Sequence, residues 1–224
     1  RPLEPGYGVT IGNALRRVLL NSLEGYAITG VRIEGVEHEF ATITGVSEDV
    51  VEILLNLKQV RLKKVVDHEV NNEKISLTIK NRTEFTAGML TEGTQSFQVM
   101  NPELLICTLD NSAKLDVELT IGKGRGYVPA EENKPKDAPL GFIPVDAIYT
   151  PIKNVKYTIE NTRVEQRTDY EKLLMEVNTD GTIHPEEAVK QASRILIQHL
   201  MIITDENITF DTKEEKKEDI VDEQ

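Results

Sequence analysis

The segment from Pro185 to Ile203 most constrains the fold, because it predicts a helix whose second half is apolar on every side. Proline suits the first turn of a helix, and Glu186 and Glu187 suit its positive end. A surface helix needs one apolar stripe, whereas a helix that is apolar all round must be covered from two sides. A large core within the chain could supply that cover. Because the sequence predicts few other helices, we expect a subunit interface instead.

The helical period assigns the side chains of this segment to faces. The expected core face comprises Ala188, Ala192, Ile195, Leu196, His199, Leu200 and Ile203. Ile197 and Met201 lie on the opposite side. A histidine on an apolar helix face is more often a satisfied core residue than a ligand, and we expect this of His199.

Residues 9 to 27, VTIGNALRRVLLNSLEGYA, predict a second helix, with Thr10 as its N-cap and Gly25 as its C-terminal stop. Its apolar face comprises Ile11, Ala14, Leu15, Val18, Leu19, Ser22 and Leu23. The other side carries Asn13, Arg16, Arg17, Leu20 and Glu24. Leu20 therefore points outward among charged side chains, and periodicity gives it no role in a core.

Most of the remaining chain predicts strands. One further helix is expected from Ser47, whose hydroxyl would cap it, to about Lys58, with Glu48 and Asp49 at its positive end. β-branched content and partial alternation predict strands at 26–34, 36–42, 60–66, 74–81, 94–99, 104–109, 113–121, 142–148, 153–162 and 170–178. Residues 131–141 predict a polar loop. Strands that do not alternate regularly with helices favour an α+β fold.

The composition narrows the functional classes. A net charge of −12 argues against direct nucleic-acid binding, which draws on clustered Lys and Arg, so any link to nucleic acid would run through a partner. The single cysteine, Cys107, lies in the apolar run ELLICTL and is expected to be a buried, inert thiol in a reducing compartment. No run approaches the roughly 20 apolar residues of a membrane span. We expect a cytoplasmic protein that contacts no membrane, with an acidic linker or tail at residues 211–224.

GKGRGY, residues 122 to 127, has the glycines and basic residues of a phosphate cradle. Its spacing fits neither a P-loop nor a dinucleotide loop, and Pro129 with a polar run follows where a helix should begin. We expect a glycine-permitted turn, or a loop through which Arg125 and Tyr127 contact another protein. The alternative is a phosphate- or nucleotide-binding enzyme that uses Gly122, Lys123, Gly124 and Arg125.

No other group of residues points to chemistry. The four histidines form no metal-ligand spacing, and no nucleophile accompanies a base. We therefore expect no catalytic residue, no metal site and no cofactor in this chain. A salt-linked corner between two sheets is expected from Arg163, Glu165, Arg167 and Asp169, with a solvated turn as the alternative.

Four blocks of the sequence closely resemble the amino-terminal domains of bacterial RNA polymerase alpha subunits. In order, between about residues 2 and 205, they are LEPGYGVTIGNALRRVLLNSLEGYAITGVRIEGVEHEF, GVSEDVVEILLNLK, GRGYVPA and RVEQRTDYEKLLMEVNTDGTIHPEEAVKQAS. Relative to the family, we expect a segment to be missing before Arg1 and a carboxy-terminal domain to be missing after the acidic tail.

The resemblance implies a homodimeric scaffold on which the beta and beta-prime subunits assemble, with nucleotidyl transfer in those partners. Residues 1–24 and 151–210 would form a discontinuous dimerisation domain of helices packed on an antiparallel sheet. Residues 25–150 would form an inserted strand-rich domain. Archaeal and nuclear relatives, which work as heterodimers, are a variant that the unbroken bacterial blocks disfavour.

The same resemblance implies roles for single residues. Arg17 and Leu20 take the positions associated with docking the beta subunit, and Asn13 and Arg16 share their side of the helix. The dimer interface would comprise Ile11, Leu15, Val18, Leu19, Ile195, Leu196, His199, Leu200 and Ile203. Arg125 and Tyr127 are weaker candidates for contact with the same partners.

Overall fold

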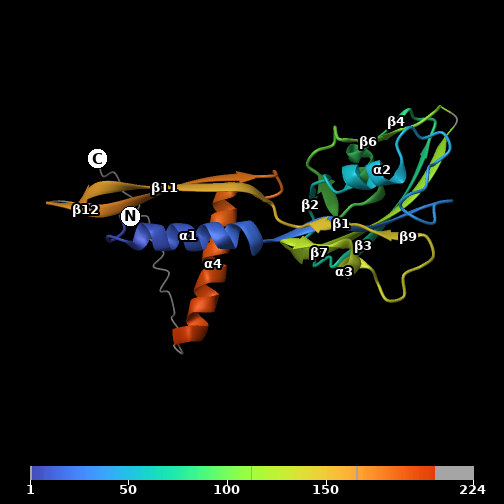
Figure 1. Ribbon diagram of the computed structural model, residues 1–224. Coiled ribbons are helices and arrows are strands. Elements are labelled where there is room, and N and C mark those ends of the chain that lie inside the picture. Colours follow the sequence, from blue (N-terminus) through green and yellow to red (C-terminus); the bar gives the residue numbers. More distant parts are fainter. Residues whose placement is uncertain (1, 112, 165, 205–224) are drawn as a thin grey trace, which may run out of the picture.

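The computed structural model describes residues 2–111, 113–164 and 166–204, and it divides into two parts joined end to end (Figure 1). We call them the helical module, made of two helices and a long hairpin, and the sheet module, made of the strand-rich segment between them. Every strand pair is antiparallel. The expected α+β fold is therefore confirmed.

The helical module brings the two ends of the described chain together. Helix α1 (Tyr7–Asn21) lies along the hairpin of β11 (Ile152–Val164) and β12 (Arg167–Thr179), and α4 (Pro185–Thr204) crosses α1 and projects beyond it (Figure 1). Two glycines, one turn apart, allow the hairpin to approach α1. A Cβ on Gly8 would lie 3.2 Å from Ile159 Cγ2, and a Cβ on Gly12 would lie 2.8 Å from the ring of Tyr157.

The start of α1 is capped from a distant strand, and the predicted local cap is wrong. The N-cap position is Gly6, which has no side chain to offer, whereas Thr10 lies inside the helix. The carboxylate of Glu171 on β12 instead accepts the backbone N–H groups of Gly6 and Gly8, at 2.9 and 2.7 Å. The predicted stop is wrong as well, because the helix ends at Asn21 and Gly25 already belongs to a strand.

The sheet module is built on one six-stranded sheet. Its path runs β3 (Asn72–Lys80), β7 (Lys114–Arg125), β1 (Glu24–Ile33), β2 (Leu62–Lys64) and β5 (Phe97–Val99), and β9 (Phe142–Pro144) also pairs with β1. Short pairs are formed by β4 (Glu84–Thr86) with β6 (Leu105–Thr108), and by β8 (Tyr127–Val128) with β10 (Ala147–Ile148). The helical segments are α2 (Val50–Leu57), the short α3 (Ala130–Asn133) and the 3₁₀ helix η1 (Ala87–Gly93).

Each module has its own buried cluster. The cluster of the sheet module lies between the sheet, α2 and η1, and includes Val31, Ile53, Phe85 and Leu119. The cluster of the helical module comprises Leu15, Leu19, Leu23, Ile152, Val155, Ala188 and Ala192. The small alanines of α4 face α1, which allows the two helices to cross at close range.

Several local predictions for the sheet module are corrected by the structure. Residues 36–42 form no strand, because the chain turns at Gly35 with a φ of 80° and continues as a loop. The cap of α2 is Asp49, which accepts the N–H of Glu52 at 2.8 Å, and not Ser47. The predicted loop at 131–141 begins inside α3, and the predicted strand at 142–148 is two short strands.

Candidate functional site

The outward side of α1 is the first candidate surface, and its residues differ in whether their side chains already bond to the rest of the chain. Asn13, Arg16 and Arg17 are exposed. Arg16 donates from Nε to the carbonyl of Val155 on β11 at 3.2 Å, so its side chain is tied to the hairpin. Within the part of the chain that the structure describes, Arg17 makes no hydrogen bond or ion pair and is available to another molecule.

Leu20 does not stand among the charged residues as the helical period predicts. It is half-buried and packs against the cluster of the helical module. The segment that returns from the sheet module also contacts the last turn of α1. Thr150 in this segment donates from its hydroxyl to the carbonyl of Leu20 at 3.2 Å.

Residues expected at a dimer interface fall into two groups. Leu15 and Leu19 are buried within the single chain. Four others, two on α1 and two on α4, are partly buried against the same cluster: Ile11, Val18, Ile195 and Leu196. Packing within the single chain therefore already covers much of this group. The second group is exposed and comprises His199, Leu200 and Ile203. The distance between His199 Nδ1 and the carbonyl oxygen of Ile195 is 2.8 Å. His199 is therefore not the core residue that the sequence predicts.

Among the described residues, the last turns of α4 leave several apolar side chains uncovered, because these turns extend past α1 (Figure 1). We call this the α4 apolar end. Its members and their exposed fractions are Ile197 at 37%, Leu200 at 58%, Ile202 at 75% and Ile203 at 78%. Exposed apolar area of this kind, grouped on one element, is typical of protein-protein contact.

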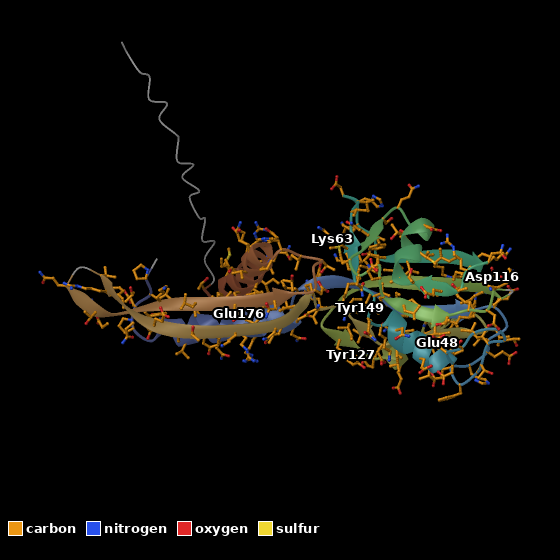
Figure 2. The ribbon with its side chains drawn as sticks, turned by 90° about the horizontal axis from the view of Figure 1, so that it is seen from above. Glu48, Lys63, Asp116, Tyr127, Tyr149 and Glu176 are labelled. Carbon is orange, nitrogen blue, oxygen red and sulfur yellow. The ribbon has the colours of Figure 1, made fainter. Side chains whose placement is uncertain are left out.

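The GKGRGY segment comprises the end of β7, a turn at Gly126 with a φ of 63°, and the first residue of β8, so the predicted glycine-permitted turn is present at Gly126. Its glycines make room for Tyr149, which lies at the junction of the two modules (Figure 2). A Cβ on Gly124 would lie 2.5 Å from the Tyr149 ring, and a Cβ on Gly25, its partner on β1, would lie 1.9 Å from the Tyr149 carbonyl oxygen. The glycines thus serve internal packing.

The basic residues of this segment already have a partner. Lys123 Nζ lies 2.9 Å from Glu24 Oε2, and Arg125 Nη2 lies 2.7 Å from Glu24 Oε1. The side-chain hydrogen bond from Lys123 has the largest effect and that from Arg125 the next largest, and both lower the pKa of the Glu24 carboxyl. With both cations paired and an extended strand in place of a loop before a helix, the segment offers no phosphate cradle.

Tyr127 is exposed on β8 and lies close to the end of α1, because Gly126 packs against the Asn21 side chain. Beside it is an ion pair that the sequence analysis missed. Lys58 Nζ lies 2.7 Å from Asp146 Oδ2, and the N–H of Ala130 donates to Asp146 Oδ1 at 2.8 Å. Lys58, followed by that N–H, lowers the pKa of Asp146. A lone acid inside the apolar run IPVDAIY was the available signal.

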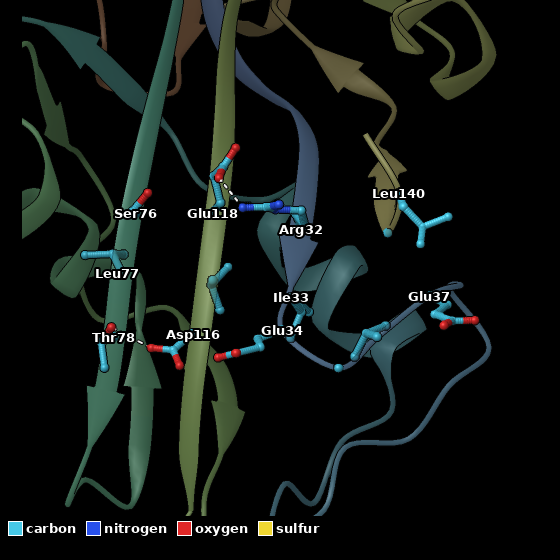
Figure 3. Close-up of a pocket in the computed structure, with 14 residues that line it drawn as sticks. Arg32, Ile33, Glu34, Glu37, Ser76, Leu77, Thr78, Asp116, Glu118 and Leu140 are labelled. Atoms are coloured by element: carbon cyan, nitrogen blue, oxygen red, sulfur yellow. Dashed lines mark hydrogen bonds and ion pairs between the residues drawn. The ribbon is translucent and has the colours of Figure 1, made fainter. Parts of the chain in front are cut away.

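A hollow of about 510 Å³ lies on the outer face of the sheet, between β3, β7, β1 and the turn at Leu140 (Figure 3). Its charged groups are matched across the strands. Arg32 Nη2 lies 2.8 Å from Glu118 Oε2, and Thr78 donates to Asp116 Oδ1 at 2.5 Å. Lys114 also pairs with Asp116. Cations thus pair with Asp116 and Glu118, and the remaining lining carboxylates make the hollow acidic.

Three further predictions can be placed. Cys107 is buried, and burial raises the pKa of its thiol to about 12, as expected of an inert thiol. The predicted corner is the tip of the β11–β12 hairpin rather than a joint between sheets, and there Arg167 pairs with Asp169 at 2.8 Å. Glu165 and residues 205–224 lie outside the described residues. Among the described residues no group of three or more His, Cys, Asp or Glu could hold a metal ion.

None of the helices in the described ranges is long and apolar enough to cross a membrane.

A family model described as the RNA polymerase Rpb3/RpoA insert domain matches residues 31–150, which is more than half of the chain.

Curated relatives match the chain over nearly its whole length. The DNA-directed RNA polymerase subunit alpha of Cytophaga hutchinsonii is 61% identical over 224 residues, covering 100% of this chain and 68% of the relative. That of Phocaeicola vulgatus is 59% identical over 214 residues, covering 96% and 64%. That of Chloroherpeton thalassium is 52% identical over 221 residues, covering 99% and 66%. The chain thus spans about two thirds of the length of these relatives. With this identity and this family match, the chain belongs to the family of bacterial DNA-directed RNA polymerase alpha subunits.

Proposed function

We propose that the chain is a homodimeric scaffold that nucleates core RNA polymerase by binding the beta and beta-prime subunits. The observation that carries this proposal is the α4 apolar end, which a single copy leaves open to water. Membership of the alpha-subunit family supports assembly with other polymerase subunits. Nucleotidyl transfer, with its metal ions, then belongs to the partner subunits, and this chain supplies no catalytic residue, cofactor or direct contact with nucleic acid.

The α4 apolar end supports a two-fold dimer. In such a dimer the same patch of both copies is buried at once, so each apolar side chain contributes twice. The half-buried residues of α1 and α4 pack against the cluster of the helical module, and we propose that they complete the shared core: Ile11, Val18, Ile195 and Leu196.

The outward side of α1 supports docking of the beta subunit. Arg17 projects from the helix with no partner among the described residues, and the turn that carries Tyr127 lies beside the last turn of the same helix. Arg125 is a weaker candidate because it is paired with Glu24. In the dimer, one copy of this surface would meet beta and the other copy would meet beta-prime.

A retention assay tests the docking surface. The chain with Arg17→Ala is purified with the beta subunit, and we expect a folded dimer that no longer retains beta, because Arg17 makes no hydrogen bond or ion pair with the described residues. Arg167→Ala at the hairpin tip is the matched control, since it removes an exposed arginine of an ion pair near the start of α1, at the opposite end of that helix from Arg17. Wild-type retention of beta by Arg17→Ala, or loss of the dimer itself, would contradict the assignment.

The division into domains is part of the proposal. We propose a dimerisation domain of residues 1–24 and 151–210, an inserted domain of residues 25–150, and a linker from 211 onward. The two separate buried clusters support this division, because their members fall on either side of these boundaries. We also propose the cytoplasm as the site of action, in keeping with a polymerase subunit family.

A further inference from the structure

The two modules are joined by only two passages of the chain. One is Ser22 and Leu23 between α1 and β1, and the other is the return segment that ends at β11. Both passages lie at the same place, around Tyr149 (Figure 2). Because the two modules are connected at a single place, they could rotate relative to each other about it unless other contacts restrain them.

One such contact lies away from the crossing point. The loop between β12 and α4 contains Asp180 and Gly181, and it meets the corner where Arg61 precedes β2 and Met100 follows β5. Asp180 Oδ2 lies 3.8 Å from Arg61 Nε, and a Cβ on Gly181 would lie 3.6 Å from the methyl group of Met100. Because β2 and β5 are one and two strands from β1, this contact acts roughly 5 to 10 Å from the crossing strand.

Each partner of the ion pair is fixed by bonds inside its own module. Asp180 donates its N–H to the carbonyl of Pro151 at 3.0 Å, and its Oδ1 accepts the N–H and hydroxyl of Thr182 at 2.9 and 2.6 Å. These bonds leave Oδ2 as the oxygen that faces the sheet module.

Arg61 is held in a corresponding way. Its N–H donates to Asn101 Oδ1 at 2.9 Å, its carbonyl accepts the N–H of Met100 at 2.9 Å, and its Nη1 donates to the carbonyl of Lys58 at 3.3 Å. The guanidinium therefore reaches the boundary from a rigid corner.

The ion pair of Arg61 and Asp180 is largely buried. The Asp180 side chain is 6% exposed and that of Arg61 is 22% exposed, unlike the surface pairs of the hairpin and α4. Salt screens a charge pair this far removed from water only weakly, and removal of one partner leaves the other charge buried without its counterion. Separating the modules at this point would leave Asp180 without a counterion.

We propose that Arg61 and Asp180 form a strut that fixes the orientation of the sheet module relative to the helical module. The passages at Tyr149 act as the hinge, and the strut, together with the contact of Met100 and Gly181, removes the remaining rotation. Arg61 and Asp180 are thus positioning residues, which act on the relative placement of two self-contained cores. This inference does not rest on the proposed docking of partner subunits, because it concerns the chain by itself.

Distance measurements between spin labels test the strut. Lys80→Cys on β3 and Lys172→Cys on β12 place one label on each module at exposed positions. Cys107 stays unlabelled because it is buried. Labelled chain is diluted into excess unlabelled chain, so that no dimer carries two labelled copies.

We expect Arg61→Met and Asp180→Asn to broaden the distance distribution at least two-fold. Asn keeps the Oδ1 acceptor for Thr182, so it removes the charge and leaves the loop intact. Arg61→Lys, which keeps the charge, should recover part of the narrow distribution. Lys190→Met is the matched control, because it removes the cation of an ion pair internal to α4 and should leave the width unchanged.

An unchanged width in both variants would overturn the proposal, as would equal broadening by Lys190→Met. Failure of Arg61→Met to fold would overturn it too, because neither core should depend on the strut. Circular dichroism and thermal unfolding of each variant separate that outcome from a change in orientation.

Discussion

The α4 apolar end allows the strength of the proposed dimer to be tested through one residue. Leu200 is 58% exposed in the single chain, so a second copy would bury at most this remaining part of its surface. Full burial of a leucine contributes about 1.5 to 3 kcal/mol, and the exposed part corresponds to about 0.9 to 1.7 kcal/mol. Because a two-fold interface contains the residue twice, the loss of this apolar burial in Leu200→Asp should weaken the dimer by up to about 1.7 to 3.5 kcal/mol.

That free energy corresponds to a rise of about 20- to 400-fold in the dimer dissociation constant. Burying the new carboxylates against an apolar patch adds to the effect. Sedimentation equilibrium over a range of concentrations measures the constant, and thermal unfolding of the monomer shows whether the chain still folds. The monomer should be stable, since water already covers most of Leu200.

The matched control is Leu19→Ala in α1. Leu19 is fully buried within the chain, so its truncation should lower the free energy of unfolding by about 2 to 5 kcal/mol in the monomer itself. If Leu200→Asp leaves the dissociation constant within two-fold of wild type, the α4 apolar end is not a dimer surface. If it unfolds the monomer, Leu200 supports its own chain and the reasoning is equally refuted.

Two further predictions concern single contacts. Glu171→Gln should lower the free energy of unfolding by about 1 kcal/mol, because the carboxylate that caps the positive end of α1 loses its charge; chemical denaturation measures this. Lys58→Met should destabilise the chain by about 0.5 to 1 kcal/mol at pH 7, since it removes the cation that lowers the pKa of Asp146. A lowered folded-state pKa stabilises the folded chain above the unfolded value of about 3.9, and this stabilisation is lost as pH falls. The difference in Tm between Lys58→Met and wild type should therefore shrink as the pH is lowered below about 3.9. A gap that persists at low pH would contradict this.

The elements found correctly from the sequence are those whose signals are local. Pro185 begins α4 and the two glutamates that follow it lie in its first turn, as predicted. The long strands β11 and β12 alternate inward and outward residues against α1, and this period is visible in the sequence. In each case a run of a dozen residues carries the whole signal.

The errors come from contacts between residues far apart in the chain. The cap of α1 is supplied by Glu171, more than 160 residues away, so a search of the neighbouring hydroxyls selects Thr10 instead. The glycines of GKGRGY resemble those of a phosphate loop, but the Tyr149 side chain occupies the space that side chains at Gly122 and Gly124 would fill, and Tyr149 is too distant in the sequence to be recognised as their neighbour. The ion pairs of Lys58 and Arg61 could not be predicted for the same reason, because their partners are distant in the sequence and a single charged residue does not indicate which residue it will pair with.

The half-burial of Leu20 changes what the outward side of α1 can offer a partner. The helical period presents an apolar centre beside Arg17, but the Leu20 side chain packs against the cluster of the helical module, and Thr150 of the return segment donates to the Leu20 carbonyl. Arg16 is likewise engaged with the hairpin. What faces outward is then mainly polar, with Arg17 as its unpaired cation. Recognition of the beta subunit at this surface would depend more on a carboxylate that meets Arg17 than on apolar area, and substitution of Leu20 would disturb the fold of the module together with the surface.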